Sequence, residues 1–152
     1  MNRVNKYRGQ RCNDGQWVYG YYVESNRSWA GHKPHKSWIV TSVMSNGGFF
    51  NVMGRYAVKD DTVGQFIGLT DKNGREIYEG DIFTVNGKYP KLVKYLDAHA
   101  CFCVANLYDL NAFPRWPEHC VYQQISFNWW KEFANEIEVI GNIYDNPELI
   151  KE

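Results

Sequence analysis

Two closely spaced glycine turns between residues 62 and 83 constrain the fold of this chain more than any other feature. The apolar run at 65–69 predicts a strand, and the Asp71-Lys72-Asn73-Gly74 segment that follows predicts a tight turn. An Asp side chain accepts backbone hydrogen bonds two residues on, and Gly adopts the left-handed conformation that closes such a turn. We therefore predict a β-hairpin at 62–83, with a second bend after residues 76–78. The residues assigned to the two turns are Asp71, Asn73, Gly74, Gly80 and Asp81.

Turn signals recur along the rest of the chain at the spacing of about 8–12 residues that is typical of β-barrels and sandwiches. Asn46-Gly47 favours a further hairpin, because both residues tolerate positive φ. The sequence therefore predicts a mostly-β fold with short helices near 129–134 and 146–151. Its other strands are expected at 17–23, 38–44, 49–53, 82–85, 92–96, 100–105, 121–127 and 137–144.

Charge divides the chain into two halves, although the formal net charge is zero. Residues 1–60 carry nine Lys or Arg against three acidic residues, a net +6. Residues 61–152 carry eight against fourteen, a net −6. Such segregation favours the docking of one half onto the other, within a chain or between copies, and it also fits a basic binding face. We expect a basic N-terminal β subdomain at 1–60, with a role in oligomerisation, and a second subdomain at 61–152.

The composition predicts a folded cytoplasmic protein. Aromatic residues make up 16% of the chain, well above what disordered segments contain. No run approaches the roughly 18 apolar residues of a membrane helix, and no apolar segment follows the basic N-terminus. We therefore expect no membrane association and no signal peptide. The four cysteines are expected to be free thiols, and we predict no cofactor.

Three segments of the chain share the pattern of one known family. They are TVGQFIGLTDKNGREIYEGDI at 62–82, IEVIGNIYDNPEL at 137–149, and YRG at 7–9 followed by GQWVYG at 15–20. In this order they resemble the YopX family of phage and prophage proteins. The resemblance implies a phage or prophage origin, a cytoplasmic location, self-association, and an SH3-like β-barrel in the C-terminal subdomain. It brings no established activity and therefore assigns no catalytic residues.

A zinc site is one candidate for chemistry. His99, Cys101 and Cys103 alternate along a predicted strand, so that their side chains point to one face, and Cys and His are the ligands that zinc prefers. His119 and Cys120 would approach from the next segment. The spacing lacks the paired knuckles of structural zinc sites, and the alternative is a strand that packs small thiols inward.

Four acids form a second candidate, for a divalent cation or an acid–base pair: Asp71, Glu76, Glu79 and Asp81. Each also has a local explanation. Asp71 caps a turn, Glu76 suits a cross-strand partner such as Lys72, and the other two flank the bend at Gly80. Because no His or nucleophile lies nearby in the sequence, we favour the structural interpretation.

A basic and aromatic loop at 24–38 is the third candidate. Cations that pair with phosphates, beside Trp rings that stack on bases, are what single-stranded nucleic-acid binding requires. The alternative is a solvated loop whose Trp side chains pack onto the core. The residues concerned are Arg27, Trp29, His32, Lys33, His35, Lys36 and Trp38.

These observations favour a non-enzymatic accessory protein of phage or prophage origin that self-associates as an interaction module. Nucleic-acid binding through the 24–38 loop is the alternative, and metal-dependent hydrolysis is the second alternative. The near-neutral pI of about 6.9 argues against strong nucleic-acid binding, because such domains are usually strongly basic.

Overall fold

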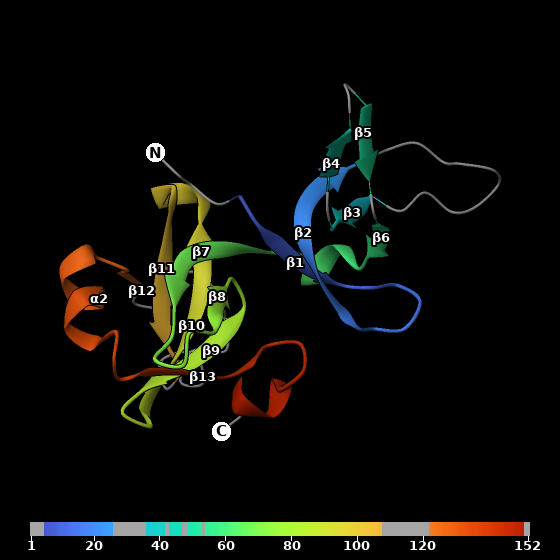
Figure 1. Cartoon of the computed structure of the whole chain (residues 1–152). Coiled ribbons are helices and arrows are strands. Elements are labelled where there is room, and N and C mark those ends of the chain that lie inside the picture. The colour runs from blue at the N-terminus through green and yellow to red at the C-terminus, as the bar shows by residue number, and fades with distance from the viewer. Residues whose placement is uncertain are drawn as a thin grey trace. The chain divides into compact units, whose positions relative to one another are not determined.

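The chain divides into two compact units, Met1–Phe66 and Ile67–Glu152 (Figure 1). The computed structural model describes residues 5–25, 36–41, 43–46, 49–52, 54–107 and 122–150. Within these ranges the regular structure is mostly antiparallel β with a single α-helix, which confirms the predicted mostly-β class. The division between the units lies a few residues after the change in charge at residues 60 and 61.

The first unit is built on an antiparallel sheet. Its strands lie in the order β6 (Arg55–Val58), β3 (Ser37–Val40), β2 (Trp17–Glu24) and β1 (Tyr7–Gln10), and the first residues of β7 (Gly64–Thr70) pair with β1. The strands β4 (Val43–Asn46) and β5 (Phe49–Val52) pair as the predicted hairpin, but the predicted strand at 38–44 is divided between β3 and β4, which belong to different sheets. A short 3-10 helix, η1 (Asp60–Thr62), precedes β7.

One face of this sheet forms the core of the first unit. Val18 of β2, Ile39 of β3 and Val58 of β6 are buried together, because strand neighbours in register share a face. Gly20 lies where β2 and β3 approach most closely. A Cβ at that position would lie 2.1 Å from the carbonyl oxygen of Val40, so the approach requires glycine.

The second unit contains a five-stranded antiparallel sheet. Its order is β12 (Tyr122–Gln124), β11 (Cys101–Asn106), β10 (Lys88–Leu96), β9 (Asp81–Val85) and β13 (Ile137–Asn142). The strand β8 (Glu76–Tyr78) lies beside β7, and the 3-10 helices η2 (Asp97–His99) and η3 (Pro147–Ile150) follow β10 and β13. The described strands close no barrel, so the SH3-like barrel is not confirmed.

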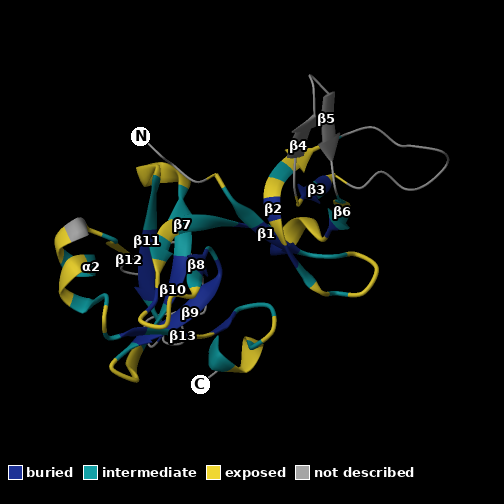
Figure 2. Cartoon of the chain, viewed as in Figure 1, coloured by how far each residue is buried: buried dark blue, intermediate teal, exposed yellow. Residues whose placement is uncertain are grey.

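The helix α2 (Phe127–Phe133) covers the core of the second unit. Trp129, Trp130 and Phe133 pack against a buried cluster that includes Phe83 and Ile137. The helix begins earlier than the predicted 129–134, and the predicted strand at 121–127 ends earlier. Both differences follow from Ser126, whose Oγ accepts the N–H of Trp129 at 3.2 Å and caps the helix. In Figure 2, the buried residues of the five-stranded sheet of this unit are dark blue.

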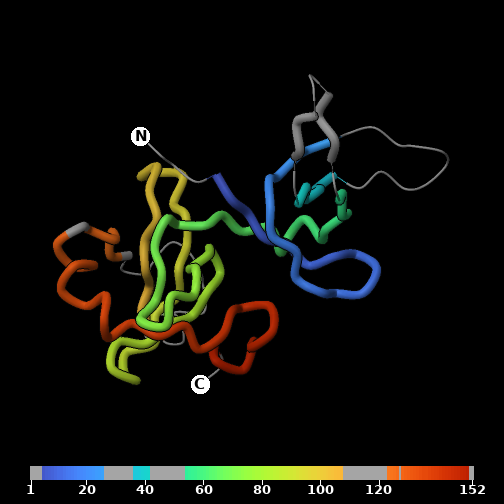
Figure 3. Tube along the Cα trace, viewed as in Figure 1, coloured from blue at the N-terminus to red at the C-terminus, as the bar shows by residue number. Residues whose placement is uncertain are grey.

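The predicted hairpin is confirmed, and it is tied to the C-terminal strand. The turn between β7 and β8 lies beside β13, where the N–H of Lys72 donates to the carbonyl of Ile137 at 2.9 Å (Figure 3). The predicted helix at 146–151 is the 3-10 helix η3, since the N–H of Leu149 bonds the carbonyl of Asn146 three residues back. No helix among the described residues is long and apolar enough to cross a membrane.

Candidate functional site

The carboxylate of Asp71 organises the first glycine turn. It is buried, and its Oδ1 accepts the backbone N–H groups of Asn73 at 2.8 Å and Arg75 at 2.9 Å. Its Oδ2 accepts the N–H of Val139 at 3.1 Å. Gly74 closes the turn at φ +78°. With both oxygens engaged by backbone donors, Asp71 has the structural role that the turn chemistry predicts.

The other three acids serve separate local contacts. The fully buried Asp81 accepts the N–H of Tyr78 at 2.8 Å, across the bend at Gly80, whose φ is +85°. Glu76 accepts the hydroxyl of Tyr78 at 2.6 Å, while Lys72 pairs with Glu138 at 2.5 Å rather than with Glu76. These contacts account for the residues as parts of turns and strand pairs.

Glu79 is the acid whose ionisation is perturbed. Burial raises the pKa of its carboxyl, and the Tyr95 N–H, which donates to Oε1 at 3.3 Å, partly offsets that rise, as does the charge of Lys94. Asp97 adds a small further increase in the pKa. A raised carboxyl pKa is one mark of a functional acid, but among the described residues no group of three or more His, Cys, Asp or Glu is placed to hold a metal.

The candidate zinc ligands are only partly brought together. Cys101 and Cys103 lie on β11 with their sulfurs 3.6 Å apart, so they share a face as predicted. His99 lies exposed in η2 rather than on the strand, because a left-handed residue, Ala100 at φ +50°, separates the two elements. His119 and Cys120 lie outside the described residues. Among those that are described, no group of three or more His, Cys, Asp or Glu side chains is placed to hold a metal.

The Cys103 thiol is buried, and burial explains its raised pKa. It is 3% exposed, and burial together with its neighbour Cys101 raises its pKa to about 11. A thiol with so high a pKa is almost entirely protonated at neutral pH and behaves as a small apolar group.

Most of the basic loop lies outside the described residues, namely Arg27, Trp29, His32, Lys33 and His35. Lys36 and Trp38 are described. Lys36 is exposed and pairs with Glu24 at 3.4 Å. Trp38 is the second residue of β3, where it stands in register with Val23 of β2.

The outer side of β2 carries an exposed apolar row, which we call the β2 stripe: Tyr19, Tyr21 and Val23. Their exposed fractions are 44%, 55% and 45%, respectively. Residues two apart on a strand point to the same side, and the neighbouring Val18 and Gly20, which point to the core side, are buried. Because Trp38 is paired with Val23, it extends this row onto β3. Figure 2 shows the alternation of exposed and buried residues along β2.

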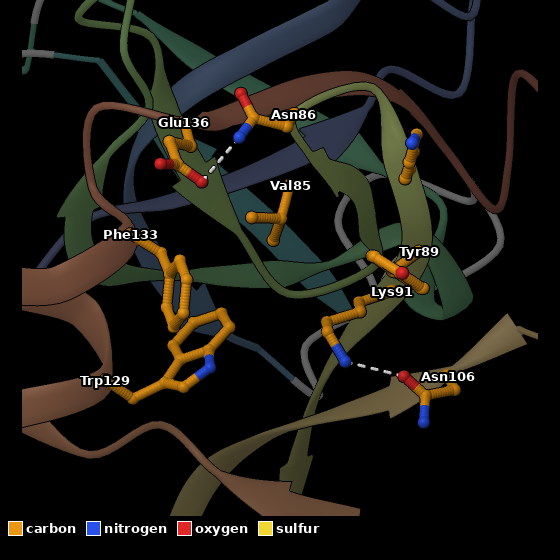
Figure 4. A pocket seen from close by; sticks show the side chains of 9 residues that line it. Val85, Asn86, Tyr89, Lys91, Asn106, Trp129, Phe133 and Glu136 are labelled. Carbon is orange, nitrogen blue, oxygen red and sulfur yellow. Dashed lines mark hydrogen bonds between the residues drawn. The ribbon is translucent and has the colours of Figure 1, made fainter.

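A pocket lies in the second unit between the β9–β10 hairpin and α2, and we call it the hairpin–helix pocket (Figure 4). Its volume is about 760 Å³. The hairpin contributes Val85, Asn86, Lys88, Tyr89 and Lys91. The rest of the lining comes from Asn106 at the end of β11, Trp129 and Phe133 of α2, and Glu136.

Hydrogen bonds fix two edges of this pocket. The Nδ2 of Asn86 donates to Glu136 Oε2 at 2.8 Å, and the N–H of Asn86 donates to the Glu136 carbonyl at 3.0 Å. At the other edge, Lys91 Nζ donates to Asn106 Oδ1 at 2.6 Å. The hairpin tip is therefore anchored to the segment that follows α2, and the pocket is largely preformed.

Neither the β2 stripe nor the hairpin–helix pocket could be predicted from the sequence. The stripe lies in a segment predicted as a strand, but Trp, Tyr and Val occupy both of its sides, so the pattern does not reveal which side is open. The pocket joins residues between 85 and 136 that only the tertiary fold brings together. The one local signal for the pocket is Tyr89, an aromatic residue just after the Asn86-Gly87 turn.

Comparison with known proteins places the chain by family and by fold. The family profile described as YopX protein matches residues 6–151. A crystal structure of protein EF1440 from Enterococcus faecalis is similar to this chain, with a TM-score of 0.56 and 20% sequence identity, over 99% of this chain and 100% of that one. At this identity the likeness extends to the fold alone. No functionally curated protein matches the sequence.

Proposed function

The chain belongs to the YopX protein family, and we propose that it is a non-enzymatic accessory protein of phage origin that self-associates as an interaction module. The observation that carries the proposal is the β2 stripe. Three large apolar side chains, about half exposed, stand in a row on an inner strand of the sheet. Contiguous apolar surface of this kind gains free energy when a partner covers it.

The charge distribution favours a second copy as the partner. The first unit, residues 1–66, carries nine basic and four acidic residues, a net +5. The second unit, residues 67–152, carries eight and thirteen, a net −5. The first unit of one copy is therefore complementary to the second unit of another. If each copy contributes both contacts, the arrangement closes as a two-fold dimer.

The proposal places the protein in the cytoplasm, where cysteines remain reduced. Exposed Cys12 and half-buried Cys101 are free thiols, in keeping with that location.

A sizing experiment with two tyrosine variants tests the proposal. Light scattering coupled to size exclusion should give a dimer for the unaltered chain. Tyr21→Thr should raise the dimer dissociation constant about tenfold or more, since it removes an aromatic ring that the partner would cover but keeps a good strand former. Tyr89→Asn is the matched control. Tyr89 is also exposed, but it stands beside Lys88, on a basic part of the second unit. If Tyr21→Thr and the unaltered chain dimerise equally well, the stripe is not the interface.

A second candidate function, single-stranded nucleic-acid binding, is favoured by Trp38. Its pairing with Val23 makes the aromatic row continuous with the end of the basic loop. Rows of aromatic side chains beside cations are the usual platform for unpaired bases.

This candidate predicts salt-sensitive retention of single-stranded DNA or RNA in a gel-shift assay. Trp38→Ala should weaken the retention, as should Trp29→Ala or Lys33→Glu, whose positions lie outside the described residues. Absence of a shift at low salt would rule out this function.

A further inference from the structure

We propose that the hairpin–helix pocket binds a planar aromatic ligand that carries a phosphate, the chemistry of a nucleotide. The proposal is independent of self-association, which assigns no ligand to this pocket. The cavity of about 760 Å³ falls within the range of roughly 300–1,000 Å³ that small-molecule sites occupy.

One wall of the pocket is a preformed aromatic surface. The ring centroids of Trp129 and Phe133 lie 5.6 Å apart, and both side chains are half-buried. Trp129 also stands 6.3 Å from the ring of Phe83, which is fully buried. Because the core holds these rings in place, a flat ligand that stacks on them loses little side-chain freedom of the protein.

Tyr89 stands on the other side of the pocket. Its backbone conformation costs free energy. Its φ is +56°, a left-handed conformation that is unfavourable for a bulky side chain. It is also 64% exposed, so burial does not compensate for the strain. Asn86 and Gly87, the left-handed residues of the same hairpin, are of the types that adopt this conformation readily. A strained, exposed aromatic ring at the mouth of a pocket is the kind of outlier that marks ligand contact.

The charges of the lining favour an anion. Lys88 and Lys91 both line the pocket on the hairpin side, although the second unit as a whole has a net charge of −5. Glu136 is the one acid of the described lining, and its Oε2 accepts a hydrogen bond from Asn86. Two ammonium groups beside an aromatic wall match a phosphate joined to a ring system.

An amide completes the match to a nucleotide base. The Asn86 side chain is held in one orientation by its hydrogen bond to Glu136, in which Nδ2 donates to Oε2 at 2.8 Å. An amide presents both donors and an acceptor, which is the pattern that pairs with the polar edge of a base. The helix α2 therefore supplies the stacking wall, and the β9–β10 hairpin supplies both the amide edge and the lysines, as Figure 4 shows for Trp129, Asn86 and Lys91.

Calorimetric titration with AMP, GMP, CMP and UMP tests the proposal on the full-length chain. We expect at least one of them to bind with a dissociation constant below about 1 mM. Adenosine or guanosine without the phosphate, and inorganic phosphate without the base, should each bind about tenfold more weakly or worse. Lys88→Ala and Tyr89→Asn should each weaken binding about tenfold, whereas Tyr21→Thr, on the β2 stripe, should leave it unchanged. The proton–nitrogen spectra of the variants establish that they are folded.

The proposal is overturned if none of the four mononucleotides binds at 5 mM (about five times the expected limit). It is equally overturned if Lys88→Ala and Tyr89→Asn both bind as the unaltered chain does, because the ligand then lies elsewhere. A single-stranded oligonucleotide separates the two sources of this chemistry. If the oligonucleotide binds more tightly than the mononucleotide and Lys88→Ala loses this gain, the natural ligand is the end of a nucleic acid. If its affinity is no better than that of the mononucleotide, the natural ligand is a free nucleotide.

Discussion

The carboxylate of Asp71 accepts the backbone N–H of Val139 at 3.1 Å, across 68 residues of sequence. The same carboxylate caps its own turn through Asn73 and Arg75. The two longest segments by which the family is recognised, 62–82 and 137–149, are therefore joined by one side chain. In this chain, turn geometry and strand docking account for Asp71 and its partners in these two segments.

We predict that Asp71→Asn destabilises the second unit by about 3 kcal/mol, since a neutral amide replaces a charged acceptor and turns one oxygen into a donor that faces a backbone N–H. Urea unfolding measures the change. Asp97→Asn is the control, because Asp97 is exposed in η2, and its effect should stay within about 0.5 kcal/mol. Equal stabilities of the two variants would contradict the role assigned to Asp71.

The raised pKa of Glu79 predicts that the stability of the fold depends on pH, and it fixes the direction of the change. Burial raises its pKa in the folded protein above the ordinary 4.5, so the folded state binds the proton more tightly than the unfolded state does. The contribution of Glu79 to stability therefore falls as the pH rises from 4.5 through the raised pKa. Glu79→Gln should remove this fall and make the protein more stable than the unaltered chain at pH 7. Urea midpoints between about pH 4 and about pH 7, a range that begins just below the ordinary pKa of a Glu side chain, measure it, and parallel curves for the two proteins would contradict it.

The cysteines should differ widely in reactivity. At pH 8 the buried Cys103, whose pKa is about 11, is about one-thousandth thiolate, and its sulfur is covered. The pKa of Cys12 is also raised, by burial and by Asp60, but its side chain is exposed. Iodoacetamide followed by peptide mass spectrometry should show Cys12 modified at least about tenfold faster than Cys103. Faster labelling of Cys103 would mean that β11 opens or that its thiol is activated.

Tyr89→Asn should stabilise the second unit by about 1 kcal/mol, because Asn adopts the left-handed conformation at lower cost. The substitution removes little buried surface, since Tyr89 is 64% exposed. Thermal or urea unfolding measures the gain. A loss of stability would show that the tyrosine ring supports the hairpin, and the strain argument for a ligand-binding role would then fail.

Local turn chemistry made part of this fold predictable. Asp71 and Gly74 act through hydrogen bonds and φ values that their own side chains determine, so the hairpin around them could be predicted from the sequence. The four-residue strands β1 and β6 were not predicted. These strands are too short to show an alternation of apolar and polar residues, and they are extended because they pair with neighbouring strands, β1 with β2 and β6 with β3.

The surfaces assigned to function were less predictable, for a different physical reason. The β2 stripe depends on which side of a doubly apolar strand the core covers, and Ile39 and Val58 of other strands decide that. The strain at Tyr89 follows from the register shift between Lys88 and Lys91, which no propensity scale encodes. The zinc hypothesis assumed that His99 continues the strand of Cys101, whereas the left-handed Ala100 ends η2 and separates His99 from β11.

The mass of the unaltered chain in solution, measured by light scattering at low and at high salt, tests self-association most directly. The account predicts a dimer of twice the 17.8 kDa chain at low salt, with a dissociation constant that rises as salt screens the opposed charges of the two units. A mass of 17.8 kDa at both salt concentrations, across the whole accessible range of protein concentration, would contradict it.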